Sequence, residues 1–134
     1  MIYKGIAGAD GIGIGQVLII KEASLDYSHV QFSGKEQEKK RLQDAIATFC
    51  QKTEVLREKV EKDVGEKQAE ILSGQIMMIQ DPFMASQMQD FIDNGQCAEA
   101  AVDQVCTTYA EMFAGVDDEL MRQRATDVRD IRSR

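Results

Sequence analysis

The feature that most constrains the fold is a change in the spacing of apolar residues near Ser33. Before it, Ile12 and Ile14 alternate with glycines and the apolar run 17–20 follows, which is typical of a strand. After it, apolar side chains recur every three or four positions up to the last residue, which predicts helices. We therefore expect a mainly α fold, in which a helical bundle is preceded by a β segment.

The opening segment is rich in glycine. Five of the ten glycines of the chain lie between Gly5 and Gly15. Glycine lets another backbone or a ligand approach closely. The pattern Gly11-x-Gly13-x-Gly15 lacks the spacing of a dinucleotide-binding loop, however, and runs into a predicted strand instead of a helix. The sequence thus favours a tightly packed strand over a phosphate-binding loop.

Turn and cap signals divide the rest of the chain into five helices. Ser33 and Glu36 have the spacing of a capping box, and Gly65 is expected to end the helix that they begin. Asp81-Pro82 suits the N-cap and first position of a later helix. The expected helices are roughly 34–64, 66–80, 83–94, 97–113 and 118–134.

The last of these helices carries an apolar stripe that includes Leu120, Met121, Ala125, Val128 and Ile131, and Asp117 or Asp118 is expected to cap it. Its periodicity continues to the final residue without a C-cap signal. The sequence is therefore expected to stop within this helix.

The second helix, 66–80, is predicted to have two apolar faces. At about 100° per residue, four side chains form a core stripe, and Ile71 and Met78 lie roughly opposite, separated by Gly74 and Gln75. The core stripe consists of Ala69, Leu72, Ile76 and Ile79.

Two interpretations of the second face remain open. A mid-helix glycine costs about 1 kcal/mol relative to alanine, so Gly74 indicates a kink or the close approach of another protein. Methionine suits an adaptable binding surface, and Glu66, Glu70 and Asp81 could surround it with negative charge for a basic partner. The alternative is that neighbouring helices bury both faces.

Charge and composition exclude several classes of function. The net charge of −7 disfavours nucleic acid. The run 17–20 is too short to insert into a membrane. Three cysteines without Cys-x-x-Cys spacing fit a reducing cytoplasm better than a disulfide scaffold or a zinc site. His29 is the only histidine and is expected to lie in a surface loop, and no nucleophile with its base is evident. The residues alone predict a docking or structural module without a catalytic or metal-binding residue.

Three blocks of sequence, in order along essentially the whole chain, carry a family resemblance. The first is GIAGADGIGIG at 5–15, the second spans 65–82 and includes GQIMMI and Asp81-Pro82, and the third is DDE at 117–119 followed by RATDVRD at 124–130. Together they resemble the N-terminal part of enzyme I of the bacterial phosphoenolpyruvate-dependent sugar phosphotransferase system.

The resemblance implies a function in phosphoryl transfer. In this family phosphoenolpyruvate phosphorylates a histidine of enzyme I, which passes the phosphoryl group to the small carrier protein HPr. Residues 1–22 would then be the first strand segment of an incomplete α/β phosphohistidine domain, and 23–134 a helical subdomain that binds HPr. The HPr-binding residues implied by the resemblance are Glu66, Ile71, Gln75, Met77, Met78, Asp81, Phe83, Met121 and Arg124.

This chain also departs from the family pattern. It lacks the Thr-His-Thr/Ser motif of the active histidine, and His29 does not match that motif. The Mg²⁺ and phosphoenolpyruvate sites and the dimer interface of the family lie in a C-terminal domain. We therefore expect no cofactor in this chain, no activity of the chain alone, and a dimeric, cytoplasmic, Mg²⁺-dependent parent enzyme. The family often has histidine where Gln75 stands and an acid where Phe83 stands, so the contact with HPr is expected to be more apolar. The alternative is a non-catalytic structural or regulatory bundle.

Overall fold

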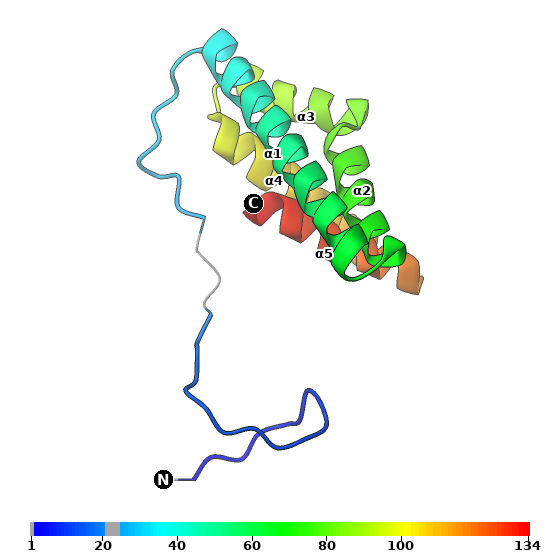
Figure 1. Cartoon of the computed structure of the whole chain (residues 1–134). Coiled ribbons are helices and arrows are strands. Elements are labelled where there is room, and N and C mark those ends of the chain that lie inside the picture. Colours follow the sequence, from blue (N-terminus) through cyan, green and yellow to red (C-terminus); the bar gives the residue numbers. More distant parts are fainter. Residues whose placement is uncertain (1, 21–24) are drawn as a thin grey trace.

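The computed structural model describes residues 2–20 and 25–134, in which five helices pack as a bundle (Figure 1). They are α1 (Lys35–Asp63), α2 (Glu66–Ile79), α3 (Pro82–Asp93), α4 (Ala98–Ala114) and α5 (Glu119–Ser133). The most extensive helix–helix contacts join α4 to α5 and α1 to α2. The prediction of a mainly α fold is confirmed. None of these helices is long and apolar enough to cross a lipid bilayer.

The core lies where α3, α4 and α5 meet the first half of α1. Met88 and Ile92 of α3, Val105 of α4 and Val128 of α5 are at most 1% exposed, as expected for apolar residues at helical spacing. Other apolar residues at the same spacing stay exposed. Leu56 and Val64 of α1 and Met112 of α4 are 40%, 65% and 54% exposed, respectively.

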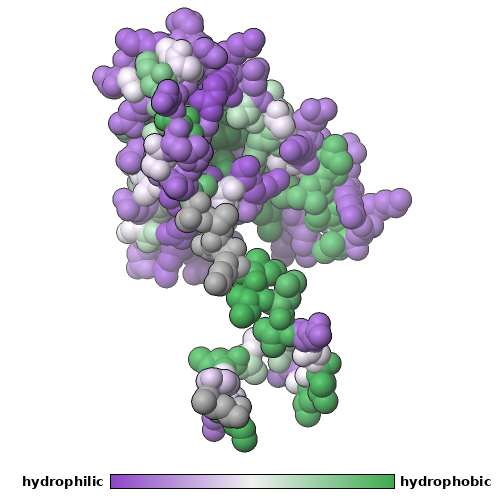
Figure 2. Space-filling model, turned by 90° about the vertical axis from the view of Figure 1, so that its left-hand side faces the viewer, coloured by the Kyte–Doolittle hydropathy of each residue, from purple (hydrophilic) through white to green (hydrophobic). Residues whose placement is uncertain are grey.

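Residues 2–20 extend away from the bundle and are exposed (Figure 1). Figure 2 shows apolar atoms gathered on this extended segment, whereas the bundle surface in the same view is mostly hydrophilic. The sequence predicts a strand here, but the structure assigns none within 2–20. A strand is defined by hydrogen bonds to a neighbour, and a Cβ added at Gly13 or Gly15 would meet no atom within 4 Å. No neighbouring strand is available in the described part of the chain.

Two of the predicted helix starts and one predicted stop are confirmed. Asp81 caps α3, accepting hydrogen bonds from the backbone N–H groups of Phe83 (2.9 Å) and Met84 (3.1 Å). Asp118 caps α5 in the same manner. Gly65 follows the last turn of α1 with φ of 139°, a conformation that favours glycine, and its N–H bonds to the Val60 carbonyl.

The predicted capping box of α1 is wrong. Gly34 occupies the N-cap without a side-chain cap, and Glu36 is exposed. Ser33 donates from its backbone N–H and its hydroxyl to Oε1 of Glu38, five residues ahead. A local sequence pattern could not reveal this, because what holds the Glu38 carboxylate inside the protein is a contact with α4.

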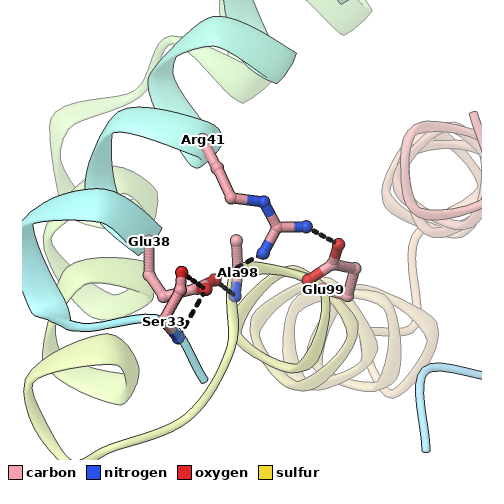
Figure 3. Close-up of polar contacts among 5 residues, drawn as sticks. All are labelled: Ser33, Glu38, Arg41, Ala98 and Glu99. Atoms are coloured by element: carbon pink, nitrogen blue, oxygen red, sulfur yellow. Dashed lines mark hydrogen bonds and ion pairs between the residues drawn. The ribbon is translucent and has the colours of Figure 1, made fainter. Parts of the chain in front are cut away.

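Glu38 is a fully buried carboxylate that joins three segments (Figure 3). Its Oε2 accepts hydrogen bonds from the backbone N–H of Ala98 (2.8 Å), at the start of α4, and from Arg41 (2.8 Å), which also pairs with Glu99. Burial by itself raises the pKa of Glu38, but the hydrogen bonds from Ser33, Ala98 and Arg41 outweigh it and hold the pKa at about 2. The carboxylate therefore fastens the connecting segment and α1 to the N-terminus of α4.

Candidate functional site

The candidate site is on α2, whose inner face packs as predicted. Ala69 and Ile79 are buried, and Leu72 and Ile76 are half-buried. On the outside of the helix, Ile71 is 52% exposed and Met77 is 74% exposed. The described structure therefore leaves part of the second apolar face of α2 uncovered.

Met78 and Gln75 lie deeper than the rest of that face. Met78 is half-buried and packs against the core cluster. Gln75 is only 3% exposed; its amide donates to Asp130 (2.8 Å) and its carbonyl oxygen accepts from Arg134 (2.9 Å). Gln75 thus faces α5, where it joins the two helices, instead of contributing to the exposed surface.

A groove with a volume of about 480 Å³ separates α2 from α5. Two of the residues that the family resemblance assigns to the HPr-binding surface line it, namely Ile71 and Arg124. So does Leu120, which the sequence placed on the core stripe of α5 but which is 59% exposed. Its other lining residues are Lys67, Gln68, Glu70, Gly74, Gln123 and Asp127.

The charges of the groove are mixed. Lys67 and Arg124 supply positive charge, and Glu70 and Asp127 supply negative charge. Burial raises the pKa of the Asp127 carboxyl above its usual range. This arrangement can bind an apolar side chain through Ile71 and Leu120 and hold polar groups around it.

The remaining predicted residues lie outside the lining of the groove. Phe83 is 75% exposed in the first turn of α3, and Met121 is 38% exposed in the first turn of α5. Glu66 is exposed at the start of α2, and half-buried Asp81 is engaged as the N-cap of α3. The structure therefore brings Ile71 and Arg124 together and leaves Met77 and Phe83 exposed beside the turn between α2 and α3.

Arg124 is the side chain that lies next to the glycine inside α2. A Cβ built on Gly74 would lie 3.5 Å from Nη1 of Arg124, so the approach that the sequence suggested comes from α5 of the same chain. That separation is an ordinary van der Waals contact, and a methyl group fits there.

Replacing Gly74 by alanine is expected to stabilise the protein by up to about 1 kcal/mol, because alanine restricts the unfolded chain and favours the helix. Urea unfolding followed by circular dichroism would measure it. Gly65→Ala is the matched control and should destabilise, because φ there is 139°. If Gly74→Ala lost as much stability as the Gly65→Ala control, there would be no room for a methyl group beside Arg124, contrary to this deduction.

The described residues show no arrangement suited to catalysis. His29 lies exposed in the connection before α1. Burial raises the pKa of the Cys106 thiol to about 11, so the thiolate needed for nucleophilic attack is scarce. No group of three or more His, Cys, Asp or Glu side chains within 2–20 and 25–134 is placed to hold a metal ion.

Comparisons with known proteins agree on one family. The family model described as "PEP-utilising enzyme, N-terminal" matches residues 4–124. The phosphoenolpyruvate-protein phosphotransferase of Listeria monocytogenes is 33% identical over 132 residues, which is 98% of this chain. The enzyme of the same name from Enterococcus faecalis is 32% identical over 135 residues, or 99% of the chain.

These relatives are much longer than this chain, which spans 23% of the Listeria protein and 24% of the Enterococcus protein. A solution structure of an enzyme I protein matches the fold with a TM-score of 0.70 and 27% identity, over 76% of this chain and 42% of that one. The family model covers most of the chain, and the relatives and the solved structure agree with it. The chain therefore belongs to the PEP-utilising enzyme family, as a relative of the N-terminal domain of enzyme I.

Proposed function

We propose that this chain is the carrier-docking part of a phosphoenolpyruvate-protein phosphotransferase and that it binds an HPr-like carrier protein. The observation that supports this most directly is the exposed Ile71, which lines the groove between α2 and α5 together with Leu120. The same helix has a buried core face, so α2 holds the bundle together on one side and is free to bind on the other.

The proposed surface combines apolar contacts with acidic surroundings. Ile71, Met77, Phe83 and Met121 would supply the apolar contact area, with Arg124 at the groove. Half-buried Met78 would contribute only its exposed part to the contact. Gln75 would support the surface indirectly, because its hydrogen bond to Asp130 joins α2 to α5. Glu66 and Asp81, in a chain of net charge −7, would attract a basic carrier.

In the proposed domain organisation, residues 1–22 are the first strand segment of an α/β phosphohistidine domain, and 23–134 form the helical HPr-binding unit. The exposed apolar side chains of 12–20 support this, because they need a neighbouring strand and a covering layer. Residues 21–24, at the boundary, lie outside the described part of the chain.

The activity belongs to the proposed parent enzyme: a histidine outside this sequence would capture the phosphoryl group of phosphoenolpyruvate and deliver it to the carrier. The parent would be a cytoplasmic, Mg²⁺-dependent homodimer in sugar uptake. The described residues do not fit a Mg²⁺ site, since no cluster of carboxylates suits a metal ion. This chain alone should transfer no phosphoryl group.

Titration with HPr tests the proposal. Shifts of ¹⁵N–¹H signals are expected to concentrate on α2, the first turn of α3 and the first turn of α5, and to weaken with added salt because the pair is held partly by charge. Shifts confined to the outer face of α1, or no shifts at millimolar carrier, would favour the alternative of a structural or regulatory bundle.

A further inference from the structure

Asp103, on α4, binds two segments that are far apart in the sequence. The hydroxyl of Tyr27 donates a hydrogen bond to its Oδ2 at 2.6 Å, and Nε of Arg132 donates to its Oδ1. The Asp103 side chain is only 16% exposed. Each carboxylate oxygen thus has its own donor, one neutral and one charged.

The two donors lie where the chain enters and leaves the helical bundle. Tyr27 belongs to the connection that precedes α1, and Arg132 lies in the last turn of α5. The two residues are 105 positions apart along the chain. A single side chain on α4 therefore joins the entry point to the exit point.

The entering segment makes further contacts, within itself and with the bundle. A backbone hydrogen bond of 2.9 Å from the Val30 N–H to the Tyr27 carbonyl closes a turn. Ser33, further on, binds the buried Glu38. Leu25 and Tyr27 also line an apolar cleft of about 330 Å³.

The end of α5 is held by other contacts as well. A change in the entering segment can therefore be distinguished from a change at the end of α5. Arg134 donates to Thr53 of α1 (3.0 Å) and to Gln75 of α2 (2.9 Å), and its guanidinium lies over the Phe49 ring at 4.8 Å. These contacts do not involve Asp103. The Tyr27 hydroxyl supplies the hydrogen bond that joins residues 25–30 to a helix in the described structure. Loss of Asp103 should therefore loosen residues 25–30 while the end of α5 stays in place.

We propose that Asp103 is a clasp that holds the entering segment, from residue 25 to the Val30 turn, against the end of α5. The clasp makes this segment an ordered part of the bundle, so that the chain enters and leaves the helices at one fixed place. This inference goes beyond the proposed docking function and does not depend on any partner.

Backbone ¹⁵N relaxation of the 134-residue chain tests the clasp. In the unmodified protein the order parameters of residues 25–30 should be close to the value of about 0.85 typical of rigid backbone, and residues 2–20 should be lower. In Asp103→Ala, residues 25–30 should fall below about 0.6, and the α5 signals should change little.

Tyr27→Phe removes only the hydroxyl donor and should lower the same order parameters even if Asp103→Ala fails to fold. Glu111→Ala, at an exposed position of α4, is the control and should leave them unchanged. The proposal is overturned if residues 25–30 stay rigid in the Tyr27→Phe variant. It is also overturned if, in the unmodified protein, residues 25–30 are as mobile as residues 2–20.

Discussion

Replacing Glu38 by alanine is expected to lower the free energy of unfolding by about 1–3 kcal/mol, the cost of leaving a buried hydrogen-bond donor without its partner. The Glu38 side chain is 0% exposed, and four hydrogen-bond donors point at its two oxygens. Without it, the Ala98 N–H at the start of α4 and the Ser33 N–H and hydroxyl lose their partner. Urea unfolding followed at 222 nm would measure the loss.

Glu36→Ala is the matched control, because the sequence assigned the cap of α1 to Glu36 whereas the structure leaves it exposed. Its effect should stay within about 0.5 kcal/mol. An equal loss of stability in both variants would mean that the capping box forms after all and that Glu38 has no special role.

The Glu38 carboxylate should also make stability depend on pH. Its pKa in the folded protein is about 2, below the ordinary value of 4.5, so the unfolded chain takes up the proton first as pH falls. The stabilisation is therefore complete above about pH 4.5 and is lost as the pH falls towards 2. In Glu38→Gln, which cannot ionise, the fall in stability over this range should be smaller than in the unmodified protein.

Ile71→Asp is expected to weaken HPr binding by at least about 30-fold, which corresponds to the roughly 2 kcal/mol that defines a strong interface contact. Ile71 is half exposed in the groove between α2 and α5, so a charge there removes apolar contact with the partner without disturbing the core. Its effect on unfolding should stay within about 0.5 kcal/mol. Isothermal titration calorimetry and urea unfolding would separate the two quantities.

Val55→Asp on α1 is a matched control, since Val55 is 65% exposed and lies outside the groove; carrier affinity should not change. Leu72→Asp, on the inner face of α2, should instead unfold the bundle. Met78 is a poorer choice for this test, because it packs against the core and an acid there would affect folding as well as binding. If Ile71→Asp destabilised as much as Leu72→Asp and left binding intact, α2 would be a structural helix only.

Local chemistry made the helices predictable. Asp81 and Asp118 cap α3 and α5 with hydrogen bonds to backbone groups two and three residues ahead. The apolar stripes of α3 and α5 follow from the helical repeat, which is why Met88 and Val128 lie in the core. The outer position of Ile71 followed from the same projection of α2.

Local spacing could not show which side chains meet partners that are distant in sequence. Gln75 is polar, yet it is buried because Asp130 and Arg134, 55 and 59 residues further on, satisfy its amide. Leu120 has the spacing of a core residue, yet it lies in the groove and is 59% exposed. The spacing of residues along the chain does not reveal that Gln75 is buried or that Leu120 is exposed.

The sequence by itself determined the number and approximate limits of the helices, much of their core stripes and the presence of two apolar faces on α2. These depend on repeats and caps that act within a few residues along the chain. Only the tertiary structure decided which parts of the second face stay open, and which polar side chains enter the interior. A buried polar group is stable only where the fold brings it a hydrogen-bond partner, as Ala98 does for Glu38 and Asp130 for Gln75.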